Sequence, residues 1–236
     1  MAAGVTFVTA LYLPSTPLYK QVNTYISHFE RLASTGVPII LFMDERLKEQ
    51  GDGLCQRFPN IQHCVYGLLD RRWISDNNKL PVVRNVQKDS ADYFCIQLSK
   101  LKVLAEAAPL AKTTHLAWID FGIFHVFQDK HLCHYWLNKI AYSHFPSGSI
   151  FVPGCWPMGS YDIWNAICWR FCGGFLLGAK DLFEPAYQTQ TRLIMENLPK
   201  LTWEVNYWVL MEPHFTYYDA DHNESLLAKV CHYTCP

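Results

Sequence analysis

The chain has 236 residues, of which half are hydrophobic and 17% are charged, and this length allows one large domain with a substantial core. The composition excludes an intrinsically disordered or fibrous protein. A formal net charge of −1 excludes a general nucleic-acid-binding protein, because such a protein needs a basic face for the phosphates.

The predicted elements alternate between strands and helices along the first part of the chain. The alternation predicts an α/β fold with a parallel sheet. No repeat or linker interrupts the sequence, so we predict one domain over residues 1–236. In chain order we expect a strand at 5–13, a helix at 19–35, a strand at 37–44, a charged helical segment and a strand at 61–68. A long ordered loop or partial helix at 70–90, a helix within 90–111 that ends near Pro109 and a strand at 114–124 follow. The last expected elements are a strand followed by a helix within 172–198, a helix at 203–213 and a strand at 214–220.

The sequence contains no run of about 18 apolar residues, and we therefore expect no membrane span. The apolar N-terminus has neither a positively charged start nor a cleavage pattern, so we do not expect a signal peptide. Nine cysteines are scattered without a repeated spacing, which favours reduced thiols in a cytoplasmic protein over a disulfide framework.

Asp120 ends the most hydrophobic predicted strand, "THLAWID", and Gly122 follows it closely. An ionised carboxylate is costly beside such a strand unless a partner compensates its charge. In open α/β sheets, ligands bind beyond the carboxyl ends of the strands, and a carboxylate there can hold a divalent cation together with phosphate oxygens. The alternative is that Asp120 only caps the next turn.

Several segments occur in an order that resembles the HtrL/YibB-like family of glycosyltransferases. They are "FVTALYL", "IILFMD", "RNVQKD" with "LSK", "WIDFGIFH", "CGGFLLGAKDLF" and "WEVNYWVLMEP", and they span roughly residues 5 to 225. The resemblance implies a single-domain GT-A-like, Rossmann-like sheet that binds a nucleotide-sugar. The donor would bind to residues of about 1–126, and the acceptor and catalytic groups would come from about 127–236.

In such a fold, Asp120 would take the place of the acidic metal-binding motif and hold Mn or Mg. The usual Asp-x-Asp is here Asp120-Phe121-Gly122, so the second acid is missing. His222 is our candidate for another metal ligand, because some GT-A families use a histidine near the C-terminus. The alternative for His222 is a polar surface turn.

Further residues are candidates for holding the donor. Fixed positive charge beside a diphosphate would help it to leave, and Asp89 could accept a hydrogen bond from a ribose or sugar hydroxyl. Paired glycines would let the backbone approach the sugar, and an aromatic face such as that of Trp156 suits its CH groups. Solvated lysines, a tight turn and core packing remain the alternatives. The candidates are Arg84, Lys88, Asp89, Lys100, Gly173, Gly174 and Trp156.

Sugar transfer needs a positioned base or a neighbouring nucleophile. Glu204 is the first candidate, because flanking Trp203 and Trp208 would provide apolar surroundings that make its carboxylate a stronger base. It could equally be a first-turn helix acid. Asp162 is a second candidate base.

The sequence therefore predicts a glycosyltransferase that moves a sugar from a nucleoside-diphosphate donor, UDP-linked in our reading, to a glycan or other hydroxyl acceptor. One alternative is a carbohydrate- or nucleotide-sugar-binding module of the same fold without catalysis. Another is a zinc-binding structural protein. Its ligands would come from His131, Cys133, His134, Cys231, His232 and Cys235.

Overall fold

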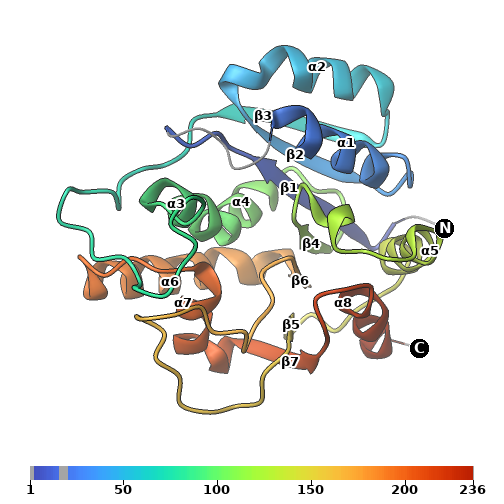
Figure 1. Cartoon of the computed structure of the whole chain (residues 1–236). Coiled ribbons are helices and arrows are strands. Elements are labelled where there is room, and N and C mark those ends of the chain that lie inside the picture. Colours follow the sequence, from blue (N-terminus) through green and yellow to red (C-terminus); the bar gives the residue numbers. More distant parts are fainter. Residues whose placement is uncertain (1–2, 16–20, 236) are drawn as a thin grey trace.

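A seven-stranded sheet runs through the centre of the protein in the order β3-β2-β1-β4-β6-β5-β7 (Figure 1). The structure, a computed structural model, describes residues 3–15 and 21–235. Residues 19 and 20, the predicted start of the first helix, lie outside this part of the chain. The strands are β1 (Val5–Leu11), β2 (Ile39–Asp44), β3 (Ile61–Gly67), β4 (His115–Ile119), β5 (Ile150–Gly154), β6 (Phe175–Ala179) and β7 (Phe215–Asp219).

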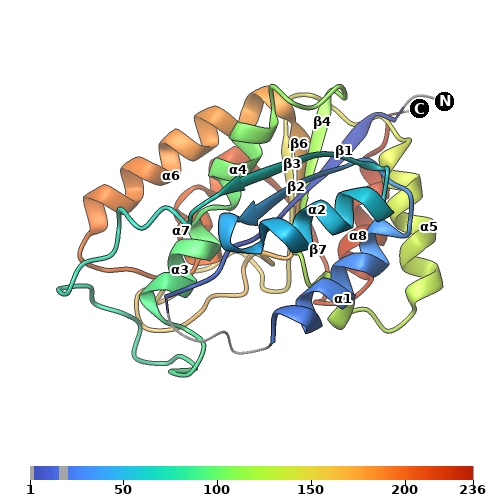
Figure 2. The same ribbon diagram turned by 90° about the horizontal axis from the view of Figure 1, so that it is seen from above.

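Helices cover both faces of the sheet, and two hydrophobic clusters fill the space between them and the strands (Figure 2). The alternation of side chains along each strand explains the two clusters, since Phe7 of β1 joins one and its neighbour Val8 joins the other. One cluster is packed by α1 (Val22–Ala33), α2 (Lys48–Arg57), α5 (Lys130–Ala141) and α8 (Ser225–Ala228); the other is packed by α3 (Ala91–Leu98), α4 (Lys100–Ala107), α6 (Phe183–Asn197) and α7 (Glu204–Leu210).

The predicted fold class is confirmed: this is an α/β domain with a mostly parallel sheet between helices. β1 pairs in parallel with both β2 and β4, and β5 pairs in parallel with β7. β6 alone among these strands runs antiparallel to its neighbours β4 and β5. In the described residues, no helix is both long and apolar enough to cross a membrane.

The strand order reverses between β1 and β4. The chain moves outward from β1 to β2 and β3, and then returns to place β4 on the other side of β1. In open α/β sheets, ligands bind in the crevice that such a reversal leaves outside the carboxyl ends of the strands. Trp118 pairs with Val8 in this register, so the chain segments after β1 and β4 lie next to each other at this edge.

The predicted helix at 90–111 is divided at Ser99 into α3 and α4. The Ser99 hydroxyl donates to the carbonyl oxygen of Ile96 at 2.7 Å, a local bond that competes with regular helical bonding. α4 therefore begins at Lys100, whose side chain is among the least exposed polar groups of the protein, at 2%.

Candidate functional site

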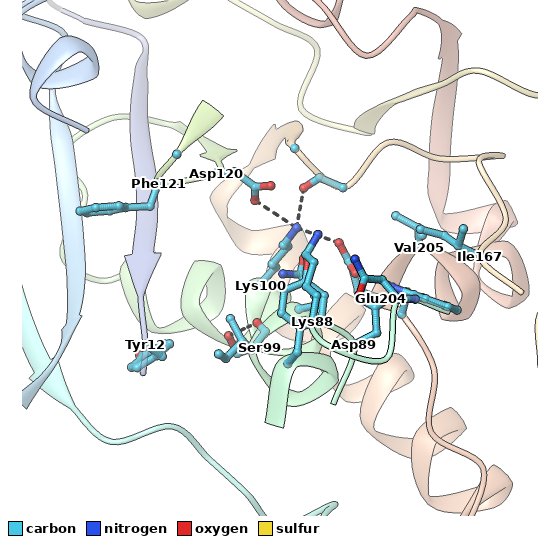
Figure 3. Close-up of a pocket in the computed structure, with 18 of the residues that line it drawn as sticks. Tyr12, Lys88, Asp89, Ser99, Lys100, Asp120, Phe121, Ile167, Glu204 and Val205 are labelled. Atoms are coloured by element: carbon cyan, nitrogen blue, oxygen red, sulfur yellow. Dashed lines mark hydrogen bonds and ion pairs between the residues drawn. The ribbon is translucent and has the colours of Figure 1, made fainter. Parts of the chain in front are cut away.

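A cavity of about 670 Å³ opens at the strand-order reversal. The segment after β1 lines it on one side, the end of β4 on another, and α3, α4 and the start of α7 close it (Figure 3). Its volume lies within the range of about 300–1,000 Å³ that is typical of small-molecule sites. Residues of both predicted halves of the chain, about 1–126 and 127–236, line the cavity.

Lys100 lies at the centre of a charged cluster in this cavity (Figure 3). Its Nζ is 2.7 Å from Oε1 of Glu204 and 3.0 Å from Oδ1 of Asp120. The same ammonium donates to the carbonyl oxygen of Gly173 at 2.8 Å. Burial alone would lower the pKa of Lys100, but the neighbouring charges of Asp120 and Glu204 raise it above its ordinary value. The cluster thus holds one cation between two carboxylates from distant parts of the chain.

Asp120 and His222 border the same small space beside Gly174. A Cβ at Gly174 would lie 3.8 Å from Oδ2 of Asp120 and 3.8 Å from Nε2 of His222. Burial lowers the pKa of His222, although the charge of Asp120 opposes this, so the imidazole is neutral at neutral pH. A neutral imidazole and a carboxylate oxygen that face one space are a suitable partial ligand set for a divalent cation.

The loop that precedes α3 brings three more predicted residues to the cavity. Asp89 is buried, and its Oδ2 accepts a hydrogen bond from the backbone N–H of Asn85 at 2.9 Å. Arg84 donates from Nε to the carbonyl oxygen of Asp89 at 3.2 Å and from Nη1 to that of Pro81 at 2.7 Å. Asp89 and Arg84 therefore use part of their bonding capacity to hold the loop. Lys88 is exposed at the cavity.

Two predicted site residues lie apart from this cavity. Asp162 and Trp156 are not among the residues that line it. Asp162 is exposed, and the Trp156 ring packs on Tyr161 with 5.4 Å between centroids. Both belong to the irregular segment between β5 and β6, whose direction the sequence pattern could not give.

The surroundings of Glu204 also differ from those predicted. Glu204 is the first residue of α7, as the helix-acid alternative expected, and it also lines the cavity. Trp203 precedes it, but the carboxylate is ion-paired with Lys100 and is not enclosed by tryptophan rings alone. A buried cation thus replaces the purely apolar environment that the sequence suggested.

Aromatic residues line much of the cavity; of those named here, Trp169 belongs to an aromatic-rich stretch that the sequence had suggested for sugar binding, and the others were missed. Tyr12 follows β1, Tyr93 lies on α3, and burial raises the pKa of both, so both phenols remain protonated donors. Trp118 donates from Nε1 to Oδ1 of Asp120 at 2.8 Å. Trp169 lies with its ring centroid 5.8 Å from that of His222. Trp118 could have been found, because residues two apart in a strand point to the same face.

Asn206 of α7 fixes the segment that carries Trp169. Its Nδ2 donates to the carbonyl oxygens of Ile163 at 2.6 Å and Ala166 at 2.8 Å, and its Oδ1 accepts from the backbone of Cys168 at 2.8 Å. We expect Asn206→Ala to lower the free energy of unfolding by about 2–4 kcal/mol, because the substitution leaves buried backbone groups unpaired. Urea unfolding measures this loss. The exposed Asn77→Ala is the control and should change stability little; an equal loss in both variants would contradict the assignment.

The zinc alternative finds no support in the part of the chain that the structure describes. There, no group of three or more His, Cys, Asp or Glu side chains is placed to hold a metal ion. None of the nine cysteines forms a disulfide in this structure. A cation in the cavity would need ligands from a bound molecule in addition to Asp120 and His222.

Comparison with known proteins leaves the family open. A scan of protein-family models found none that matches, and a search of curated proteins found no match. The resemblance to the HtrL/YibB-like family therefore stays an expectation.

Several solved structures match this chain at low identity. The bifunctional IspDF from Campylobacter jejuni is 8% identical, with a TM-score of 0.43 over 92% of this chain and 49% of that chain, so this protein spans about half its length. The inositol-1-phosphate CTP transferase from T. maritima is 8% identical, with a TM-score of 0.47 over 97% of this chain and 94% of that chain. The glycosyltransferase GlyE of Streptococcus pneumoniae TIGR4 is 11% identical, with a TM-score of 0.43 over 90% and 44%. Likeness at this level carries no activity over to this chain.

Proposed function

We propose that this protein is a glycosyltransferase that moves a sugar from a nucleoside-diphosphate donor, UDP-linked, to a hydroxyl of a glycan or another acceptor. The observation that carries the proposal is the charged cluster of Asp120 and the buried Lys100 and Glu204 in a cavity at the strand-order reversal. Such a crevice is where open α/β sheets bind nucleotides. The aromatic side chains that line the cavity suit a nucleobase and a sugar, and the few charged groups that converge there suit a diphosphate.

Glu204 acts as the base in this proposal. Its carboxylate accepts the proton of the acceptor hydroxyl while the acceptor oxygen bonds to the anomeric carbon of the sugar. The bond from that carbon to the phosphate oxygen breaks, and the nucleoside diphosphate leaves. If the transfer retains configuration, the same carboxylate is the neighbouring nucleophile or stabiliser.

Asp120 and His222 would hold a divalent cation, Mn or Mg, together with the donor diphosphate. The fit rests on Oδ2 of Asp120 and Nε2 of His222, which both face the space that the missing side chain of Gly174 leaves open. Two protein ligands are few, but Mg²⁺ sites commonly combine one or two carboxylates with substrate phosphates and water. When bound, the cation supplies positive charge for the leaving diphosphate.

A thermal-shift screen of nucleoside diphosphates, UDP- and GDP-sugars and nucleoside triphosphates, with and without Mn, tests the function. A ligand that binds only the folded protein stabilises it and therefore raises Tm. The stabilisation is about 2.7 kcal/mol when the ligand concentration is one hundred times Kd. We expect a diphosphate or its sugar to raise Tm, and Mn to enlarge the shift.

Three results would contradict the proposal. A shift with triphosphates alone would indicate nucleotidyl transfer instead. Binding of a nucleotide-sugar without turnover in any acceptor assay would indicate a binding module. If no nucleotide shifts Tm, the protein has no nucleotide-sugar donor site.

A further inference from the structure

Arg84, Lys88 and Lys100 are the cations that were predicted to lie near the donor diphosphate, and the structure gives them different surroundings. An ammonium group has three N–H donors. Those of Lys100 are directed to Glu204, Asp120 and Gly173, at 2.7, 3.0 and 2.8 Å. The group is also buried, so water does not provide further partners. Lys100 could meet a phosphate only by leaving one of these acceptors.

Giving up one of these contacts would be costly. Glu204 is only 3% exposed, and its carboxylate accepts a hydrogen bond from the Lys100 ammonium. A buried charge that loses its partner is strongly destabilising, far more than the same loss at the surface. A Cβ at Gly173 would collide with Oε1 of Glu204 and lie 3.0 Å from Nζ of Lys100, so the backbone fits closely around this pair. The pair is a fixed part of the cavity.

Lys88 is in the opposite situation. It is exposed at the cavity, where its Nζ lies 4.8 Å from the centroid of the Tyr93 ring. With the residues that the structure describes, this ammonium makes no hydrogen bond or ion pair. Figure 3 labels it among the residues that line the cavity, as it does Lys100. All of its donors are therefore available to a ligand, and its flexible stem allows it to reach a phosphate.

We propose that Lys88 is the cation that binds the donor diphosphate, and that Lys100 is a positioning residue that fixes the carboxylates of Glu204 and Asp120. This division of roles rests on the proposed function, because it assigns both lysines with respect to a diphosphate in the cavity. Arg84, whose guanidinium donates to the carbonyl oxygens of Pro81 and Asp89, helps to hold the loop that carries Lys88.

Ligand binding and kinetics of two variants separate the roles. With UDP and Mn as the probe, Lys88→Met should weaken binding roughly tenfold, the loss expected for one charge-assisted hydrogen bond, and raise the donor KM similarly. Lys100→Met should leave Kd and KM within about threefold but lower kcat roughly a hundredfold, because misplaced reacting groups cost rate more than affinity. Lys102→Met, on the same helix and outside the cavity, is the control.

The reverse pattern would overturn the proposal. A loss of UDP affinity in Lys100→Met as large as that in Lys88→Met would make Lys100 a phosphate ligand. If Lys88→Met binds UDP as tightly as the wild type, Lys88 does not bind the diphosphate. If Lys100→Met does not purify folded, Lys100→Gln, which keeps two N–H donors, takes its place.

A stability cycle tests the Lys100 role without any nucleotide. Lys100→Met leaves the Glu204 carboxylate buried and unpaired, so it should lower the urea midpoint. Adding Glu204→Gln removes that charge, and the double variant should be more stable than Lys100→Met alone. Additive losses would contradict the pairing. A wild-type protein that binds no nucleoside diphosphate would refute the proposed function and the Lys88 role together, while this cycle would still decide the role of Lys100.

Discussion

Glu204→Gln is expected to lower kcat about a thousandfold while the affinity for the donor stays near that of the wild type. A glutamine amide keeps the shape of the side chain and can still accept the hydrogen bond from Lys100, but it cannot take a proton from the acceptor. Loss of a general base costs typically 10²–10⁴ in rate. Initial rates of sugar transfer, with Kd for the nucleoside diphosphate measured in parallel, test this expectation.

The matched control is Glu49→Gln, the same substitution at an exposed position on α2. It should leave both rate and affinity unchanged. A Glu204→Gln protein that transfers sugar at the normal rate would end the assignment of the base. A protein that loses donor binding together with activity would instead place Glu204 among the binding groups.

The strands of this fold could be predicted because their apolar runs are continuous. Ile39–Asp44 and His115–Ile119 are buried along their whole length, as strands covered by helices on both faces require. The antiparallel direction of β6 could not be predicted, since its pairing with β4 depends on the path of an irregular segment of the chain. The break at Ser99 was missed because local hydrogen bonding outweighed a good helical pattern.

The sequence could predict the site residue that lies at the end of a strand. It could not predict which residues from distant parts of the chain meet there. Asp120 follows a buried strand, so its place at the ligand edge came from the pattern. The pairing of Lys100 with Glu204 joins residues 104 positions apart and has no local signal. One hint existed: Lys100 lies in a helical segment whose nearby residues Leu98, Leu101 and Val103 are apolar. A buried lysine needs an acid partner, but this need alone does not say which acid of the chain supplies it.

Asp120→Asn is the second substitution with a large expected effect, and it separates two roles of one carboxylate. An asparagine can keep an oxygen toward Trp118 Nε1 and Lys100, so the fold should be retained. The other side of the group, where Oδ2 borders the space beside Gly174 that His222 also borders, becomes an amide that cannot serve as an anionic ligand. We expect the Mn-dependent part of the Tm shift to disappear and transfer to fall about a hundredfold or more.

Asp162→Asn provides the comparison for this variant, because it makes the same chemical change at an exposed position outside the cavity. Its Tm shift with donor and Mn should equal that of the wild type. Normal turnover in Asp120→Asn would make the cation assignment wrong and leave Lys88 as the cation for the diphosphate. Loss of turnover with an unchanged Mn effect would mean that Asp120 acts through Lys100, as a second acceptor that keeps the ammonium beside Glu204. The metal dependence of Asp120→Asn therefore decides whether the acid at the end of β4 serves a cation or a lysine.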